Sequence, residues 1–489
     1  MILLLLLLAA AAQSQPLKIR AITATGPQIV EFPLERYVVA AVTGESSVFQ
    51  SAEALKAMTI AARTYAVRHR GRHASEGFDF CSSTHCQRLE RGAFHPGVES
   101  AASETIAELL WYEGKPAFTP YSLDCGGFTE QASTVWPDEA ASYLTFKPDP
   151  YCRRAGASSW QWAADPQDIT SALSRSSLRS PPGLAAISIL EKSPSGRALT
   201  LALTGDRETV RISAGSFRFA IGRHLGWNTL RGDLYQVRSA GGKLLFQGSG
   251  SGHGVGLCQR GAEQMGLAGL SHQEILAFYF PGTKLGISGR GHPWRLLAGD
   301  SIQLLTTQPD QDRVALAEAE RQLRHLAART RLEFPRNVQL RIYPDVETFR
   351  NATGEPGWVA ARTRARRIHL QPVHVLRRRG ILETTLGHEL LHVLLESHAA
   401  PALPLWFREG LAGFLESGPA STNAPHPSDT GLRQKHDPAL ARRNHAASVA
   451  AVSALVRRYS EETVFDWLKR GLPAEVANAS TSQPAASSR

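Results

Sequence analysis

A glycine-rich stretch at 286–293 divides the sequence into two segments, each long enough to enclose its own hydrophobic core. The stretch reads Gly-Ile-Ser-Gly-Arg-Gly-His-Pro and offers little to bury, which is typical of a linker. With 489 residues the chain exceeds the usual size of one domain, while its 43% hydrophobic and 20% charged content is ordinary for a globular protein. We therefore predict two domains of the α+β class, at 15–289 and 290–473.

The two ends of the chain differ from the rest in composition. Residues 1–12 form an apolar run that is too short to cross a bilayer, and polar residues follow it, so we predict a signal peptide at 1–14. An uncleaved anchor is the alternative. We expect export to the periplasm, the cell wall or the extracellular space, with no transmembrane span beyond the leader. Residues 474–489 are rich in Ala and Ser and are predicted to be a disordered tail.

The formal net charge of +10 indicates a basic protein. No nucleic-acid-binding motif accompanies this charge, so we expect no nucleic-acid partner. On an exported chain the positive charge could attract anionic wall polymers or membrane surfaces. The simpler alternative is that the arginines are solvated on helix and strand faces.

Hydrophobic periodicity locates several elements. In the first segment it predicts a helix over 51–70 with Ser51 as N-cap, a β-hairpin within 186–213, and a strand pair at 234–237 and 244–246. In the second segment we expect a small sheet followed by a helical half. The predicted elements there are a strand near Ile302, a helix over 313–330, strands at 338–343, 358–361 and 367–370, and helices at 382–396 and 405–415.

Three separated blocks of the first segment carry more information than composition. They are Gly44-Glu45-Ser46 with the helix up to Tyr65, then Asp124-Cys125-Gly126-Gly127-Phe128-Thr129, then Gly252-His253-Gly254-Val255-Gly256-Leu257-Cys258-Gln259. In this order they resemble the blocks of the SpoIID/LytB family, over roughly 17–285. In the third block, Cys258 stands where the family usually has a serine.

The resemblance implies a lytic transglycosylase acting on peptidoglycan glycan strands. Such an enzyme needs only one acid, because the 6-hydroxyl of the sugar replaces water as the nucleophile. By resemblance that acid is Glu45, which would protonate the leaving oxygen and then accept the proton of the 6-hydroxyl. Substrate binding is expected from His253, Arg63 and Gln259.

Each of these assignments has a plainer alternative. Glu45 precedes the predicted helix and can simply be an acid favoured by its dipole, and His253 can belong to a glycine-rich turn. At the level of function, the family also includes amidase enhancers, which would bind glycan without cutting it and have a cell-wall amidase as their partner.

The five cysteines fall into two groups. His73, Cys81, His85 and Cys86 lie close together in sequence, which suits either a structural zinc site or a Cys81–Cys86 disulfide in an oxidising compartment. In the second group we expect a Cys125–Cys152 disulfide. If Cys81 and Cys86 act together, Cys258 is the odd thiol.

The second segment contains His388-Glu389-Leu390-Leu391-His392 in a predicted helix. This spacing places two imidazoles on one helix face, where both can bind one zinc, with Glu389 beside them to activate a metal-bound water. The plainer interpretation is an exposed helix without a metal, or a metal-binding domain without activity.

The sequence Trp406-Phe407-Arg408-Glu409-Gly410 resembles the second helix of gluzincins, zinc peptidases whose third ligand is a glutamate. The resemblance implies Glu409 as the third ligand of a catalytic zinc and a peptide or protein as substrate. A further reading of the whole chain gives the peptidase the main role and makes the first domain its targeting module.

Overall fold

The computed structural model describes residues 16–479 except 24–25, 84, 91, 140, 157, 288–292, 421–426, 428 and 434–437. The predicted signal peptide and most of the predicted linker lie outside the described residues. The chain forms two compact units, one spanning Pro16–His292 and the other beginning at Pro293, and each is considered by itself. None of the described helices is long and apolar enough to cross a membrane.

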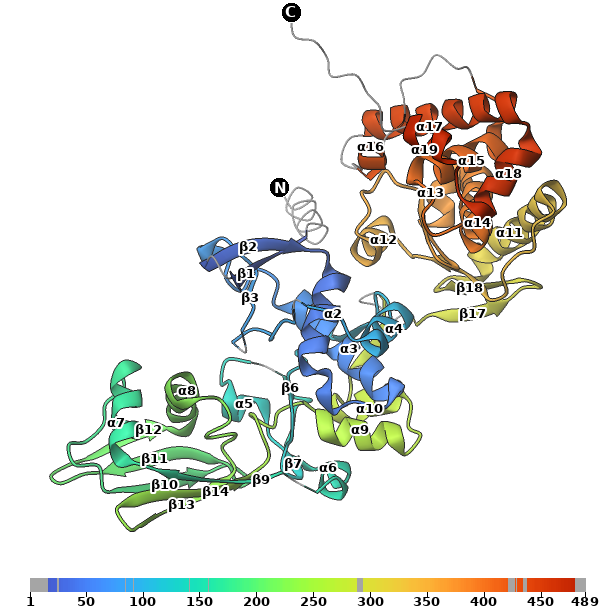
Figure 1. Cartoon of the computed structure of the whole chain (residues 1–489). Helices are drawn as coiled ribbons and strands as arrows, with labels where there is room; N and C mark the ends of the chain where they lie inside the picture. Colours follow the sequence, from blue (N-terminus) through green and yellow to red (C-terminus); the bar gives the residue numbers. More distant parts are fainter. Residues whose placement is uncertain are drawn as a thin grey trace, which may run out of the picture. The chain divides into compact units, whose positions relative to one another are not determined.

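Helix α3 (Ala52–Arg68) is the centre of the helical part of the first unit (Figure 1). Ser51 accepts a hydrogen bond from the Ala54 N–H, which confirms the predicted N-cap. Because α3 is rich in alanine, other helices approach it closely on several sides, and most of its residues are buried. Its helical neighbours are α2 (Leu34–Glu45), α4 (Pro96–Glu104), α9 (Gln259–Leu267) and α10 (His272–Tyr279).

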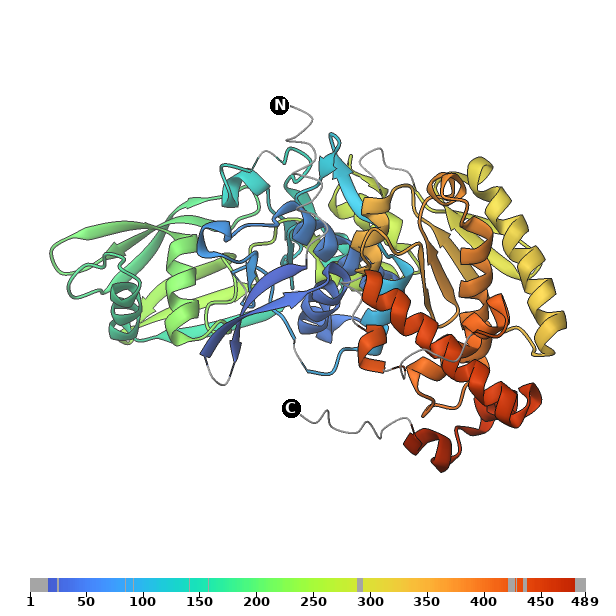
Figure 2. The ribbon, with the colours of Figure 1, turned by 90° about the horizontal axis from the view of Figure 1, so that it is seen from above.

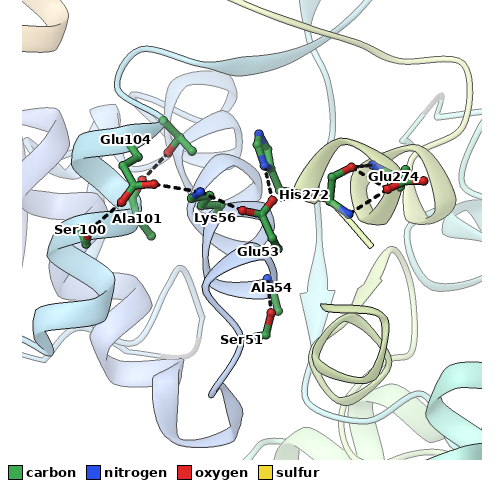
Figure 3. Close-up of polar contacts among 11 residues, drawn as sticks. Ser51, Glu53, Ala54, Lys56, Ser100, Ala101, Glu104, His272 and Glu274 are labelled. Carbon is green, nitrogen blue, oxygen red and sulfur yellow. Dashed lines mark hydrogen bonds and ion pairs between the residues drawn. The ribbon is translucent and has the colours of Figure 1, made fainter. Parts of the chain in front are cut away.

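Charged side chains join α3 to two of these neighbours (Figure 3). Lys56 lies 2.8 Å from carboxylate oxygens of both Glu53 and Glu104, the latter on α4. The other Glu53 oxygen accepts hydrogen bonds from the backbone N–H of His272, at 2.8 Å, and lies 2.7 Å from its ring Nδ1. Burial opposes the charge, yet the bonds from Lys56 and His272 lower the pKa of Glu53 to about 2. One carboxylate thus bridges segments more than two hundred residues apart.

Small sheets surround this helical core. The parallel pair β6–β15 aligns Tyr121 with Leu257 and Ser122 with Cys258, and so brings the second and third sequence blocks side by side. The sheets are β2-β1-β3, β16-β4-β5, β15-β6 and β7-β8. Their strands are β1 (Leu17–Thr23), β2 (Gly26–Phe32), β3 (Phe80–Cys81), β4 (Leu109–Tyr112), β5 (Lys115–Pro116), β6 (Tyr121–Ser122), β7 (Phe128–Thr129), β8 (Lys147–Pro148), β15 (Leu257–Cys258) and β16 (Lys284–Gly286). Short helical segments complete this part: η1 (Ser46–Val48), η2 (Ala74–Glu76), α5 (Ala132–Val135) and α6 (Pro150–Arg154).

A second hydrophobic core of the first unit is built by residues between the second and third blocks, around Trp160, Phe217 and Phe246. Two three-stranded sheets, β10-β11-β12 and β13-β14-β9, enclose it with two helices (green in Figure 1). Both predicted strand pairs are confirmed, but a separate core here was not predicted. The elements are β9 (Ser159–Ala164), α7 (Pro166–Arg175), β10 (Ala186–Lys192), β11 (Ala198–Thr204), β12 (Thr209–Ser213), α8 (Ala214–Leu225), β13 (Tyr235–Ala240) and β14 (Lys243–Ser249).

The second unit contains a five-stranded sheet in the order β17-β18-β19-β21-β20. The long helix α11 runs beside it (yellow in Figure 2), and because α11 and α14 contact both the sheet and each other, they cover the same face. The elements are β17 (Arg295–Ala298), β18 (Ile302–Thr306), α11 (Pro309–Thr330), β19 (Val338–Ile342), α12 (Val346–Thr353), β20 (Ala361–Arg364), β21 (Arg367–Leu370), α13 (Val373–Arg378) and α14 (Leu382–His398). The strand predicted at 358–361 was wrong in position, since β20 begins only at Ala361 and pairs with β21 as a tight hairpin.

The helical half consists of α15 (Leu405–Ser417), α16 (Asp429–Arg433), α17 (Pro438–Tyr459), α18 (Glu461–Arg470) and α19 (Ala474–Ala479). A Cβ at Gly410 would lie 2.3 Å from the Ser448 carbonyl oxygen, so this glycine permits the close approach of α15 to α17. Residues 474–479, predicted as the start of a disordered tail, form α19 instead, and Val476 packs into the core. The remaining residues of the predicted tail lie outside the described part.

Candidate functional site

Glu45 is the last residue of α2, at the point where the chain turns into η1 and then α3. It therefore lies at the C-terminus of α2, where the dipole disfavours a negative charge, and it is also the N-cap residue of the short segment η1. Gly44 before it allows the backbone of Arg88 to pass closely, since a Cβ there would lie 3.0 Å from the Arg88 carbonyl oxygen.

The carboxylate of Glu45 is partly buried and accepts a hydrogen bond of 3.1 Å from the Gln259 side-chain amide. Burial raises the pKa of Glu45, while the bond from Gln259 and the charge of Arg88 oppose the rise. The first and third blocks thus meet at one acid with a raised pKa. Such an acid suits proton donation near neutral pH.

Gln259, predicted to bind substrate, has only 1% of its surface exposed, so its contact is with Glu45. His253, also predicted for substrate binding, accepts a hydrogen bond from the Val255 N–H on Nδ1 and makes another with the Tyr121 backbone. Its ring packs edge-on against Trp136. Burial, reinforced by Arg218 and Arg197, lowers the pKa of His253 to about 3, so this imidazole is neutral.

Arg63 does not lie in a cleft, contrary to the prediction that it binds substrate. Its side chain is completely buried and pairs with Glu35, with two donor nitrogens each 2.8 Å from a carboxylate oxygen. It also donates to Thr105 and to two backbone carbonyls. Since all its donors are used inside the helical core, Arg63 has a structural role.

The four residues at 73–86 assemble into one cluster. Cys86 Sγ lies 3.3 Å from His73 Nε2 and 3.6 Å from His85 Nδ1, and Cys81 Sγ lies 3.8 Å from the same His85 atom. Both cysteines are free thiols, so the alternative Cys81–Cys86 disulfide is not formed. One donor atom from each residue lies within 4.8 Å of the others, a set that can hold a tetrahedral metal.

The predicted Cys125–Cys152 disulfide is also absent, because both residues are free thiols. Cys125 Sγ donates to Asp149, and Cys152 Sγ donates to Asp124. Cys258 lies in the same buried group rather than apart as an odd thiol.

In the second unit, α14 and α15 bring the predicted zinc ligands together. The Nε2 atoms of His388 and His392 are 3.0 Å apart, and the Glu409 carboxylate lies 3.5 Å from His392 Nε2. Burial opposes the charged form of His392, yet the neighbouring carboxylates, Glu409 above all, raise its pKa to about 9. The three donors fit a site with three protein ligands and an open fourth position.

Three supporting residues of this cluster were missed by sequence reasoning. Glu416 lies 3.0 Å from His388 Nδ1 and can orient that ring, and His445 of α17 lies 3.7 Å from Glu409. Thr363 on β20 donates a 2.6 Å hydrogen bond to Glu389. No motif marks these positions, because each comes from a different element.

Comparison with known proteins supplies the family of the first unit. Residues 24–112 match the family described as "Stage II sporulation protein" (SpoIID), and residues 152–256 match a domain of unknown function. The chain carries a SpoIID-family domain at its N-terminus. The matched range holds Glu45, all of α3 and the four-residue cluster.

Curated relatives of the SpoIID domain agree with this assignment. An uncharacterised protein of Brachyspira hyodysenteriae is 31% identical over 52% of this chain and 67% of its own length. The amidase enhancer of Bacillus subtilis is 27% identical over 48% of this chain, but only 38% of its own length is covered. The stage II sporulation protein D of Bacillus amyloliquefaciens is 24% identical over 56% of this chain and 80% of its own length.

The buried ion pair between Arg63 and Glu35 predicts that replacing Arg63 destabilises the SpoIID domain. We expect Arg63→Met to lower the free energy of unfolding by about 3–5 kcal/mol, because it leaves a largely buried carboxylate without its partner. Urea denaturation of the full chain checks this. Arg68→Met on the same helix is the control, since Arg68 is half-exposed and its pair should contribute about 0–1 kcal/mol. Equal losses for both variants would contradict a structural role specific to Arg63.

Proposed function

We propose that this chain is an exported cell-wall remodelling protein whose SpoIID domain is a lytic transglycosylase with Glu45 as its acid. The observation that carries the proposal is the position of Glu45: a carboxyl group of raised pKa, held by Gln259 from the third block. The relatives named for sporulation and for amidase enhancement support a role at the cell wall.

In the proposed reaction, protonated Glu45 gives its proton to the glycosidic oxygen as the bond to the sugar C1 breaks. The carboxylate then accepts the proton of the 6-hydroxyl, whose oxygen bonds to C1 and closes the anhydro ring. No water is consumed, and Glu45 ends protonated for the next cycle. The Gln259 amide fits both states, because it donates to the carboxylate and holds the side chain in place while its charge changes.

The direct test is incubation of purified peptidoglycan glycan with the full-length protein, followed by mass spectrometry of the released muropeptides. Products ending in 1,6-anhydro sugars are expected. Products carrying an added water would instead indicate hydrolysis, and no released product would remove the transglycosylase assignment.

The raised pKa of Glu45 predicts a pH dependence of stability. In the folded state burial disfavours the charged form, so Glu45 stabilises the fold below its unfolded pKa and loses this contribution as pH rises through its folded pKa. We therefore expect Glu45→Gln to raise the free energy of unfolding at pH 7, with the gain disappearing near pH 4. Urea denaturation at both pH values checks this, with the exposed Glu99→Gln as control. A gain that is larger at pH 4 would contradict the direction of the pKa shift.

A second activity is proposed for the other unit: a zinc metallopeptidase acting on a peptide or protein of the wall. Its support is the convergence of His388, His392 and Glu409, with Glu389 beside them. Zinc held by these three residues would supply Lewis-acid polarisation of a peptide carbonyl and an acidified water. Glu389 would hold and move the proton of that water. Cleavage of a peptide library that chelator abolishes would support this activity, and an inert protein in every library tried would count against it.

The alternative for the first unit is an amidase enhancer, which the named Bacillus subtilis relative favours. In that case the SpoIID domain binds glycan and stimulates a cell-wall amidase without releasing product itself. Three results together would support this alternative. The protein would be retained on insoluble wall, it would release no anhydro products, and the Glu45→Gln variant would stimulate the amidase as strongly as wild type.

A further inference from the structure

Three thiols and a carboxylate meet in the first unit at a place separate from Glu45 and from the cluster at 73–86. Cys125, Asp149, Cys152 and Cys258 each have essentially none of their surface exposed. One donor atom from each lies within 4.8 Å of the other three. The Sγ of Cys125 is 3.3 Å from Asp149 Oδ2.

These separations suit a common metal ion. Zinc binds thiolate sulfur at about 2.3 Å and carboxylate oxygen at about 2.0–2.2 Å, so neighbouring ligand atoms of a tetrahedral site lie about 3.5–3.8 Å apart. The four donor atoms need only small movements to reach that geometry. Soft thiolates together with one oxygen favour zinc over magnesium or calcium.

The surroundings hold the ligands in place for such a role. Asp149 keeps Oδ1 for the backbone N–H groups of Tyr151 and Cys152, at 3.1 and 2.9 Å, while Oδ2 faces the thiols and accepts from the Tyr279 hydroxyl. Cys258 Sγ accepts from the backbone N–H groups of Cys125, at 3.2 Å, and Gly261, at 3.4 Å. Backbone donors of this kind stabilise a thiolate, and Gly261 supplies one of them from the first turn of α9.

A buried cation also lies beside the group. Arg197 is 4% exposed, and its guanidinium donates to the Cys125 carbonyl at 2.7 Å. Three thiolates and a carboxylate carry more negative charge than one divalent ion removes, and Arg197 can compensate part of the excess. A Cβ at Gly254 would lie 2.0 Å from Arg197 Nη2, so the glycine of the third block makes room for this side chain.

We propose that Cys125, Asp149, Cys152 and Cys258 form a structural zinc site of the first unit, separate from the cluster at 73–86. With four protein ligands it leaves no open position for catalysis. Its ligands come from the second block, from the segment just before the inserted core, and from the third block just after it. The ion therefore links both ends of the segment that forms the second hydrophobic core, around Trp160, to the helices around α3. This role does not depend on whether Glu45 cuts glycan.

The test compares zinc content by elemental analysis in full-length wild type, Cys258→Ser and Cys86→Ser. Serine differs from cysteine by one atom, the oxygen in place of sulfur, so we expect this variant to fold. Each variant should contain about one zinc atom per chain fewer than the wild type, because each loses a ligand of a different site. Equal zinc in wild type and Cys258→Ser would overturn the proposal.

Two further measurements keep the proposal testable if Cys258→Ser fails to fold. Asp149→Asn retains an oxygen for the two backbone N–H groups but removes the charged ligand, and it should also lose about one zinc atom per chain. In wild type denatured and alkylated without reductant, peptide mass mapping should find all three thiols alkylated. A peptide cross-linked through Cys125 and Cys152 would show a disulfide in place of the zinc site and overturn the proposal.

Discussion

Glu45→Gln should lower the rate of anhydro-muropeptide formation by about 10²- to 10⁴-fold, the usual contribution of a general acid–base group. Glutamine keeps the size of the side chain and can still accept the hydrogen bond from Gln259, but it cannot donate a proton to the leaving oxygen. The expected loss is in kcat, because the group acts on the reacting atoms. Liquid chromatography with mass spectrometry of a timed glycan digest measures it.

Two controls make the result specific. Glu99→Gln removes an exposed carboxylate from α4 in the same domain and should leave the rate unchanged. Wall binding should be retained by both variants, since each removes a single carboxylate charge and leaves the rest of the surface unchanged. A Glu45→Gln protein that forms anhydro-muropeptides as fast as wild type would transfer the acid–base chemistry to another residue.

Glu389→Gln should lower the rate of peptide cleavage by about 10²-fold or more, while the zinc content stays unchanged. The reason is that the proposed metal donors are His388 and His392 of α14 and Glu409 of α15, whereas Glu389 accepts a hydrogen bond from Thr363 of β20. Glutamine preserves that bond but cannot accept a proton from water. Activity on a cleavable peptide and elemental analysis of the same sample separate the two effects.

The matched control on α14 is Glu383→Gln, in the exposed first turn of the helix. Glu409→Gln provides the contrasting case, since it should lose both zinc and activity. If Glu389→Gln lost its zinc as well, Glu389 would be a ligand, and the assignment of Glu409 would need revision.

Local sequence was sufficient for the elements that carry the motifs. Ser51 and the hydrophobic periodicity that follows it predicted α3, and the spacing of His388 and His392 predicted their common face on α14, because both patterns depend on neighbours along one helix. Residues supplied by distant elements escaped prediction. Asp149 and Glu416 belong to no motif, and only the fold brings them to Cys258 and His388.

Two predictions failed for a related reason. Arg63 was expected to bind substrate because it lies in the first of the three blocks, yet its side chain forms a buried ion pair with Glu35. The Cys125–Cys152 bridge was inferred from a count of cysteines and the character of their flanking segments, which contain no information on a third thiol approaching from residue 258.

The bond between Gln259 and Glu45 joins residues 214 positions apart, and α9 and α10 close against α3 from the same late part of the chain. During synthesis the N-terminal helices emerge long before these partners, so the acid cannot acquire its donor until nearly the whole first unit has left the ribosome. In a nascent or prematurely terminated chain, Glu45 therefore lacks its contact with Gln259. Assembly of the site is coupled to completion of the domain.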